Sequence, residues 1–444
     1  MRILVLIGII LSVSASVKAQ QTTYTLAECI DFAVNNSYES KRSRYAENEA
    51  EYSVSEAKAG LYPQIKATGD LNHSLILPTT MLPGELIGQS GTQIPVQMGS
   101  KNELEFSVIA EQVVFSPQLF AGIKIARNRL ELEKIKSSLT KEEVVYNVCQ
   151  TYYDIRKTTS ELECLVQIIS MQDSLYRLME KRVQQNITRV LDLNRVKINL
   201  TNLRSNAINV GNTLSQQMAY FKILLGVPLK DSFAIDNSEI IAKSDEYLIL
   251  DEFHPQRMTE ISVLNKQQQI LALEMQGRKM QYLPSLSAFA SAGYQFQSDK
   301  FRLSKDPWYK TAIIGLRLTV PIFDGFSRRS QIRKHKAGMN NLEQTLLETE
   351  QTLSANFQNA KTSLSVAGEL MNMQSDNITL AETAYRQTLA LYDEGLSDIT
   401  DVLETETSLL ESRMSYITQL IQYKKAEVEC LKSNGNLTEY YLKQ

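Results

Sequence analysis

The longest part of this chain without glycine or proline, residues 123–210, spans 88 residues. Both residue types interrupt helices, so their absence over this length permits one very long helix. Apolar side chains recur there at helical spacing, for example at Val145, Val148 and Tyr152. We therefore predict a helix from about Gln118 to Gln185, roughly 100 Å long at about 1.5 Å per residue.

Two later stretches share this property. Residues 327–394 contain only Gly338 and Gly368, and residues 396–434 contain neither glycine nor proline. Helices of these lengths greatly exceed the mean of about 11–12 residues in globular proteins. The sequence therefore predicts a mainly α-helical chain, in which each long helix turns back into a second helix.

Four other segments alternate between apolar and polar residues. In one of them Ile314, Leu316 and Leu318 alternate with Arg317 and Thr319. We predict four strands of about 13 to 16 residues, each with one apolar and one polar face. The alternation is clearest over 63–72, 103–113, 284–295 and 310–322, and the strands form two hairpins closed by a Pro/Gly-rich loop over 78–100 and by residues 298–307.

The length of these strands indicates whether they can cross a membrane. Half-buried strands at the edge of a soluble sheet would also alternate, but ordinary strands have only about 5–6 residues. An outer-membrane strand needs about 9–11 tilted residues with apolar and polar side chains in alternation. Four strands cannot close a barrel, and lipid does not tolerate an open edge, so several chains must share one barrel.

Composition excludes several other classes. The mean hydropathy of −0.23 argues against a helical membrane bundle, and the net charge of −3 gives no electrostatic footprint for nucleic acid. His73, His254 and His335 are isolated, so we expect no metal site and no cofactor. No nucleophile-plus-base pattern is visible, so we do not expect an enzyme.

The first 19 residues resemble a secretory signal peptide. Arg2 precedes an apolar core over residues 3–13, and a small-residue segment ends at Ala19. The core is too short to span a membrane, so we predict cleavage and export.

Four cysteines lie far apart and form no C-x-x-C pattern. We interpret Cys29, Cys149, Cys164 and Cys430 as small buried residues on helices. A disulfide between Cys29 and Cys430, near the two ends of the chain, is the open alternative.

The chain is interpreted as a duplication. Leu61-Tyr62-Pro63 corresponds to Tyr282-Leu283-Pro284 at an offset of 221, because the first hairpin is longer. After the hairpins, Val114 corresponds to Ile322 at an offset of 208, and Val190 to Ile399 and Gly226 to Gly435 at an offset of 209. A nearly constant offset over about 110 residues indicates an internal repeat. The predicted division is 1–19 signal peptide, 20–226 first repeat (β-hairpin about 64–115, helical tip about 186–188), 227–260 inter-repeat equatorial segment, and 261–444 second repeat (β-hairpin about 285–323, helical tip about 395–397).

The predicted helical turns carry a family resemblance. The second reads Tyr392-Asp393-Glu394-Gly395-Leu396-Ser397-Asp398-Ile399-Thr400-Asp401, and Asn186 takes the place of Gly395 in the first. Glycine and asparagine are the residues best suited to a left-handed helix end. Together with the paired β-hairpins and an opening segment over Tyr24–Asn36, these features resemble the TolC family of outer-membrane efflux proteins, the outer membrane factors.

This resemblance implies a homotrimer in which each chain gives four strands to one twelve-stranded outer-membrane β-barrel. It also implies an α-helical periplasmic tunnel that receives substrate from an inner-membrane efflux pump or ABC exporter through a periplasmic adaptor (membrane fusion protein). The implied function is passive export in a tripartite efflux or type I secretion system, with outer-membrane lipid around the barrel and no nucleic-acid partner. A secreted or periplasmic coiled-coil scaffold, and less so an exported hydrolase, are the alternatives.

The resemblance also assigns three groups of residues. The chain departs from the family pattern at Leu191 and Ser397. The alternatives are helix-end charge for the gate acids, turn packing for the tip residues and ordinary solvation for the lumen residues of the groups named next. The groups are a periplasmic gate at Asp192, Tyr392, Asp401 and Glu404, with Asp192 hydrogen-bonded to Tyr392; adaptor-docking tips at Asn186, Ile187, Thr188, Gly395, Leu396 and Ser397; and a barrel lumen lined by Glu103, Glu105, Glu111 and Arg317.

Overall fold

The computed structural model describes residues 23–83, 88, 91–238, 252–300 and 307–442. The predicted signal peptide lies outside these residues. The chain divides into two compact units, which we call the sheet unit (residues 47–133 and 264–345) and the helical unit (residues 1–46, 134–263 and 346–444).

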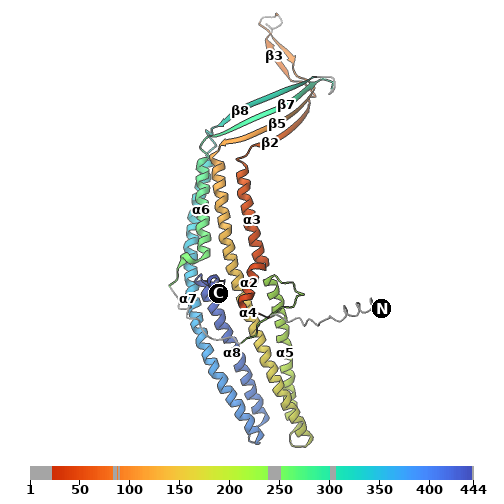
Figure 1. Ribbon diagram of the computed structural model, residues 1–444, viewed down its shortest axis with the longest axis vertical. Helices are drawn as coiled ribbons and strands as arrows, with labels where there is room; N and C mark the ends of the chain where they lie inside the picture. Colours follow the sequence, from red (N-terminus) through yellow and green to blue (C-terminus); the bar gives the residue numbers. More distant parts are fainter. Residues whose placement is uncertain (1–22, 84–87, 89–90, 239–251, 301–306, 443–444) are drawn as a thin grey trace, which may run out of the picture. The chain divides into compact units, whose positions relative to one another are not determined.

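Long helices dominate the structure, as Figure 1 shows. The first, α4, covers Pro117–Gln184, and its 68 residues confirm the predicted helix within one residue at each end. Its counterpart α7 covers Ser327–Asp393. Each turns back into a second helix, α5 (Val190–Leu225) or α8 (Ile399–Ser433). Within the described parts of the chain, no helix is both long enough and apolar enough to cross a membrane.

The shorter helices precede the strands or follow the long helices. They are α2 (Leu26–Asn36), α3 (Tyr38–Ala59), α6 (Thr259–Met280), α9 (Leu437–Leu442) and the 3-10 turn η3 (Pro255–Arg257).

The two helical turns have the same backbone geometry, as predicted. Asn186 has a φ of 59° and Gly395 a φ of 76°, so both residues are left-handed. The next amide in each turn, that of Ile187 or Leu396, donates to the carbonyl oxygen five residues before it. This hydrogen-bond pattern closes the helix end because it satisfies carbonyls that have no partner within the helix.

The sheet unit contains one four-stranded antiparallel sheet in the order β2-β5-β7-β8. The strands are β2 (Gln64–His73), β5 (Asn102–Phe115), β7 (Ser285–Ser298) and β8 (Trp308–Thr319). The two predicted hairpins are confirmed, and β5 pairs with β7 to join them. The predicted length of 13 to 16 residues is wrong for β2, with 10 residues, and for β8, with 12. Strand β8 ends before Pro321, which has no amide hydrogen for the sheet.

The loop predicted over residues 78–100 is wrong as well, because it contains a second hairpin. Strand β3 (Thr79–Pro83) pairs antiparallel with β4 (Gln93–Gln97). Pro83 and Pro95 weakened the strand signal in the sequence. In a two-stranded ribbon each strand is an edge, where proline is tolerated because its missing donor can face outward.

The main core of the helical unit forms between α2, α4, α5, α8 and α9. Its fully buried members include Ile30, Val148 and Phe221. All four cysteines are free and buried, so the open alternative of a bond between Cys29 and Cys430 is not realised in the structure. A short parallel pair, β1 (Thr23–Tyr24) with β6 (Ala234–Ile235), joins the start of the described chain to the segment after α5.

Candidate functional site

The four-stranded sheet separates two chemically different faces. On one face, Ile65, Ala110, Ala290 and Ile314 lie directly opposite one another across all four strands. On the other face, a row of small and mostly polar residues runs from Thr68 through Ser107 and Gly293 to Thr311. The alternation predicted for each strand is therefore in register over the whole sheet.

The side chains of the apolar face are exposed in the single chain. Ile65 is 72% exposed, Ile314 86% and Leu316 70%. Soluble proteins rarely leave so continuous an apolar surface uncovered, so this face marks a contact with lipid or protein. The edges of the sheet are uncovered too, since β2 and β8 each pair on one side only.

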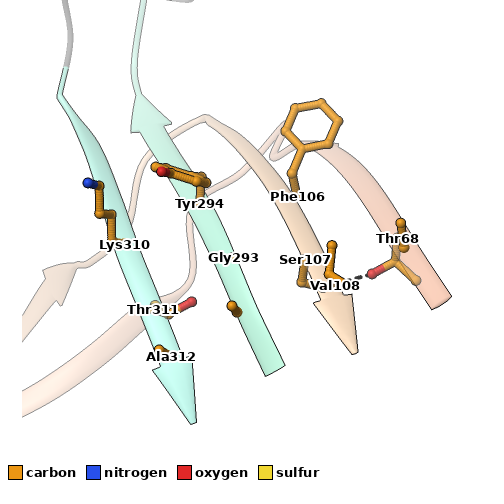
Figure 2. Close-up of a pocket in the computed structure, with 11 residues that line it drawn as sticks. Thr68, Phe106, Ser107, Val108, Gly293, Tyr294, Lys310, Thr311 and Ala312 are labelled. Atoms are coloured by element: carbon orange, nitrogen blue, oxygen red, sulfur yellow. Dashed lines mark hydrogen bonds between the residues drawn. The ribbon is translucent and has the colours of Figure 1, made fainter. Parts of the chain in front are cut away.

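A groove of about 660 Å³ lies against the middle of the sheet (Figure 2). Its large side chains, Phe106, Tyr294 and Lys310, belong to one cross-strand row of the apolar face. The ammonium of Lys310 lies 5.7 Å from the centre of the Tyr294 ring. Figure 2 also shows the hydrogen bond between the Thr68 and Ser107 hydroxyls, 2.8 Å long, in the polar row.

The residues expected to line a lumen share the polar face. The Glu103 carboxylate accepts hydrogen bonds from the side-chain amides of Gln295 and Gln297. Arg317 lies 3.9 Å from the Glu111 carboxylate, and its guanidinium is stacked 5.0 Å above the Phe289 ring. Glu105 has the same strand parity as Glu103 and Glu111 and so lies on this face. The polar face therefore carries hydrogen-bonded and ion-paired side chains.

Each tip of the helical unit exposes a large apolar side chain directly after its left-handed residue. Ile187 is 67% exposed and follows the left-handed Asn186, whereas Leu396 is 73% exposed and follows Gly395. Thr188 and Ser397 complete the two turns. Because both tips have the same backbone and the same apolar residue position, they form a matched pair of surface projections.

The structure places Asp192 and Tyr392 near each other without joining them. The Tyr392 hydroxyl donates to Met179 Sδ at 3.0 Å. Asp192 is 6% exposed, and its carboxylate lies 3.4 Å from Arg189 and 3.9 Å from Arg195. Burial raises the pKa of Tyr392, and the negative charge of Asp192 raises it further. The predicted hydrogen bond between these two residues is thus replaced, within the chain, by a link from α7 to α4.

Asp401 and Glu404 differ in their surroundings. The Asp401 carboxylate accepts hydrogen bonds from the Ser397 hydroxyl at 2.8 Å and from the Asp398 amide at 3.1 Å. These bonds lower the pKa of Asp401 and form a capping box at the start of α8. Glu404, one turn later, is exposed. Asp401, one of the two expected gate acids, therefore stabilises the start of α8, whereas Glu404 has no part in the capping box.

Glu406 is an acidic residue near the tips that the sequence reasoning missed. It is 3% exposed and accepts hydrogen bonds from the side-chain amides of Gln172 and Asn199. Burial raises its pKa to about 8. The helical spacing could have predicted its burial, because Val402, Glu406 and Leu409 lie on one buried face of α8.

Comparison with known proteins agrees with this geometry. Residues 263–436 match the family described as outer membrane efflux protein. No curated protein matches the sequence.

Solved structures match almost the whole chain. The outer membrane protein VceC of Vibrio cholerae has a TM-score of 0.71 at 15% identity, over 92% of this chain and 96% of that one. The outer membrane channel CmeC of Campylobacter jejuni has a TM-score of 0.70 at 15% identity, over 93% and 86%. The open state of the MtrE channel of Neisseria gonorrhoeae has a TM-score of 0.69 at 13% identity, over 93% and 89%.

These structures share the fold of long helices and antiparallel β-hairpins, so the resemblance to the TolC family and the expected fold class are confirmed. TolC-like channels typically form trimers and are not enzymes. The family match thus covers residues 263–436, and the fold shared with outer-membrane efflux channels covers almost the whole chain.

Proposed function

We propose that three copies of this chain close one twelve-stranded barrel in the outer membrane. The observation that carries this proposal is the four-stranded sheet, with an exposed apolar face and two unpaired edges. An open edge in lipid would leave backbone amides and carbonyls without partners, at several kcal/mol for each group. Pairing β8 of one copy with β2 of the next removes every edge when the third copy closes the ring.

The two faces of the sheet then have different surroundings. The apolar face contacts lipid, and the polar face lines the lumen. Glu103, Glu105, Glu111 and Arg317 keep the wall hydrated. The hydrogen bonds of Glu103 with two glutamines and the Arg317–Glu111 ion pair support this role rather than selection of one substrate.

We propose that the chain has two repeats with equivalent roles. The first covers residues 20–226 and the second residues 261–444, with residues 227–260 between them and residues 1–19 as a signal peptide. The same order of elements supports this division: helix, β-hairpin, long helix, turn and return helix occur twice. Each repeat thus contributes one β-hairpin to the barrel and one helical hairpin to a periplasmic tunnel.

The helical tips are proposed as the periplasmic entrance and as the docking surface for an adaptor. Exposed Ile187 and Leu396 provide small apolar contacts on two turns of matched geometry. The turns contain Asn186, Ile187 and Thr188 in one repeat and Gly395, Leu396 and Ser397 in the other. An adaptor that holds these tips would connect the tunnel to an inner-membrane pump or ABC exporter.

The gate is proposed to use acids just above these tips. Three copies of Asp401 and Glu404 would form two rings of negative charge, an arrangement that favours cations. Asp192 and Tyr392 lie beside the same helix ends, and the contact of Tyr392 with Met179 supports a closed arrangement of α7 against α4.

Membrane fractionation tests the proposal as a whole. The protein is expected in the outer-membrane fraction and should need detergent for extraction. Recovery as a soluble periplasmic protein would instead favour the coiled-coil scaffold.

A further inference from the structure

Helix α3 carries an acidic and aromatic edge near the sheet. Glu49, Tyr52 and Glu56 are exposed, and Tyr52 is 74% exposed. At about 100° per residue these three side chains lie within roughly 60° of one another on the helix. They lie opposite Val54, which is buried at 6% exposure. We call these three residues the acidic edge.

Helix α7 carries a basic edge at its start. Arg329, Arg333 and Lys336 are exposed and also lie within roughly 60° of one another. They lie opposite Gly338, which lines a cavity shared with Ile270 and Leu271 of α6. The basic edge therefore points away from the side of α7 that faces α6.

The six side chains of the two edges have no partners in the part of the chain that the structure describes. Among the described residues, no hydrogen bond or ion pair joins any of them to another group. By contrast, the neighbouring Arg328 is tied to Asp324 and to the carbonyl oxygen of Gln281. The two edges are thus available for a contact outside the chain.

The topology places the two edges at opposite sides of the sheet unit. Helix α3 leads into β2 and α7 follows β8, and β2 and β8 are the two edge strands. The register of the strands puts the end of α3 and the start of α7 at the same end of the sheet. When β8 of one copy pairs with β2 of the next, α7 and the neighbouring α3 run antiparallel beside each other.

The spacing of the two edges matches in this arrangement. Glu56, Tyr52 and Glu49 lie three, seven and ten residues before the last residue of α3, Ala59. Arg329, Arg333 and Lys336 lie two, six and nine residues after the first residue of α7, Ser327. Both sets therefore have the spacing of four and then three residues, in opposite chain directions.

We propose that the basic edge of one copy binds the acidic edge of the next copy, an inference that rests on the trimeric barrel proposed above. Arg329 pairs with Glu56 and Lys336 with Glu49, while the guanidinium of Arg333 stacks on the Tyr52 ring. Exposed ion pairs are weak one by one, so the main effect is on register and partner choice. Since each copy has one edge of each sign, only a head-to-tail ring pairs them all.

Cross-linking tests the contact directly. The variant with Glu56→Cys and Arg329→Cys should give disulfide-linked dimers and trimers on a non-reducing gel after oxidation in detergent. In the matched control, Ala57→Cys replaces Glu56→Cys, because Ala57 is partly buried and lies about 100° around α3 from Glu56, and no linked species are expected. The mass of the uncross-linked particle is measured in parallel. A trimer without cross-links overturns the edge contact but leaves the barrel intact, whereas the absence of any trimer contradicts the proposed function itself.

Charge exchange provides a second test. Arg329→Glu with Lys336→Glu should lower the temperature at which the trimer dissociates by several degrees, and adding Glu49→Lys with Glu56→Arg should restore it. Lys334→Glu makes the same kind of charge change on a different face of α7 and should have no effect. Failure of the exchange to restore the trimer overturns the pairing. If the exchange fails and the variant with the reversed basic edge also loses binding to phosphatidylglycerol vesicles, the basic edge binds lipid headgroups instead.

Discussion

The Tyr392 hydroxyl donates a hydrogen bond to Met179 Sδ at 3.0 Å, which ties the end of α7 to α4 beside the helical tips. Arg182, one turn after Met179, lies 5.8 Å from the centre of the same ring. Tyr392 is therefore held both by its hydroxyl and by its ring. This contact joins the end of α7 to α4 next to the proposed gate.

Removing the Tyr392 hydroxyl should loosen that contact. Tyr392→Phe keeps the ring and loses only the hydrogen bond, which contributes about 0.5–1.5 kcal/mol. We expect a higher open probability or conductance in single-channel recordings from lipid bilayers. Tyr385→Phe is the control, because Tyr385 is buried in the same cluster. Equal recordings for Tyr392→Phe and the unchanged protein would exclude Tyr392 from the gate.

Removal of the two gate acids should widen the entrance. Asp401→Ala with Glu404→Ala should raise single-channel conductance and weaken cation preference, because two rings of negative charge disappear. The Asp401 substitution also removes one hydrogen bond of the capping box, at a cost of about 1 kcal/mol.

Glu404→Gln distinguishes the effect of lost negative charge from the effect of a lost capping hydrogen bond. Glu404 is exposed and has no part in the capping box, so this variant should weaken cation preference without loss of stability. Unchanged conductance and unchanged ion preference in both variants would contradict the assignment of these acids to the gate.

Glu406 should make stability depend on pH. Burial raises its pKa from 4.5 to about 8, so between these values the folded chain binds a proton that the unfolded chain releases. The free energy of unfolding should therefore fall as pH rises through this window, by up to about 1.4 kcal/mol per pH unit. Below the window the group has no effect.

Glu406→Gln should remove this part of the pH dependence and stabilise the protein near pH 8. Thermal unfolding of detergent-solubilised protein across pH 4 to 9 gives the measurement, and Glu404→Gln is the exposed control. The same pH slope in Glu406→Gln and the unchanged protein would contradict the effect of burial.

Gly293 should tolerate no side chain. A Cβ atom at this position would lie 2.6 Å from the backbone oxygen of Phe106, in the paired strand β5. Gly293→Val should therefore disturb the β5–β7 pairing, at roughly 1–3 kcal/mol, and lower the yield of heat-resistant protein on a gel. Ala292→Val, the adjacent substitution on the apolar face, is the control. Comparable yields for both variants would show that the strands can separate at Gly293 without loss.

The exposed tips should be needed for export but not for assembly. Ile187→Asp with Leu396→Asp places charge where an adaptor would bury apolar surface, so export by cells should fall sharply. Protein level, membrane location and single-channel conductance should stay unchanged. Thr188→Ser is the control in the same turn. Normal export by the double variant would argue against adaptor docking at these residues.

Local sequence signals predicted most of the fold. The great length of α4 followed from the scarcity of glycine and proline, its start from Pro117, and the left-handed Asn186 from its place at the position of Gly395. Alternation assigned the faces of the strands correctly because side chains in a strand repeat every two residues. Prolines concealed the β3–β4 hairpin, since their usual meaning is a loop.

Contacts between distant residues could not be predicted in the same way. Met179 accepts a hydrogen bond from Tyr392 across 213 positions, and Gln172 donates to Glu406 across 234. Neither partner carries a local signal, because the choice depends on how α4, α7 and α8 pack. The tip residues were named from the family resemblance, whereas their bonding became visible only in the structure.

The mass of the detergent-solubilised particle tests the central claim most directly. Light scattering corrected for bound detergent should give three times the mass of the mature chain, which is slightly below the 50.3 kDa of the full sequence. A particle with the mass of one chain, stable without detergent, would contradict the shared barrel and with it the channel proposed for this protein.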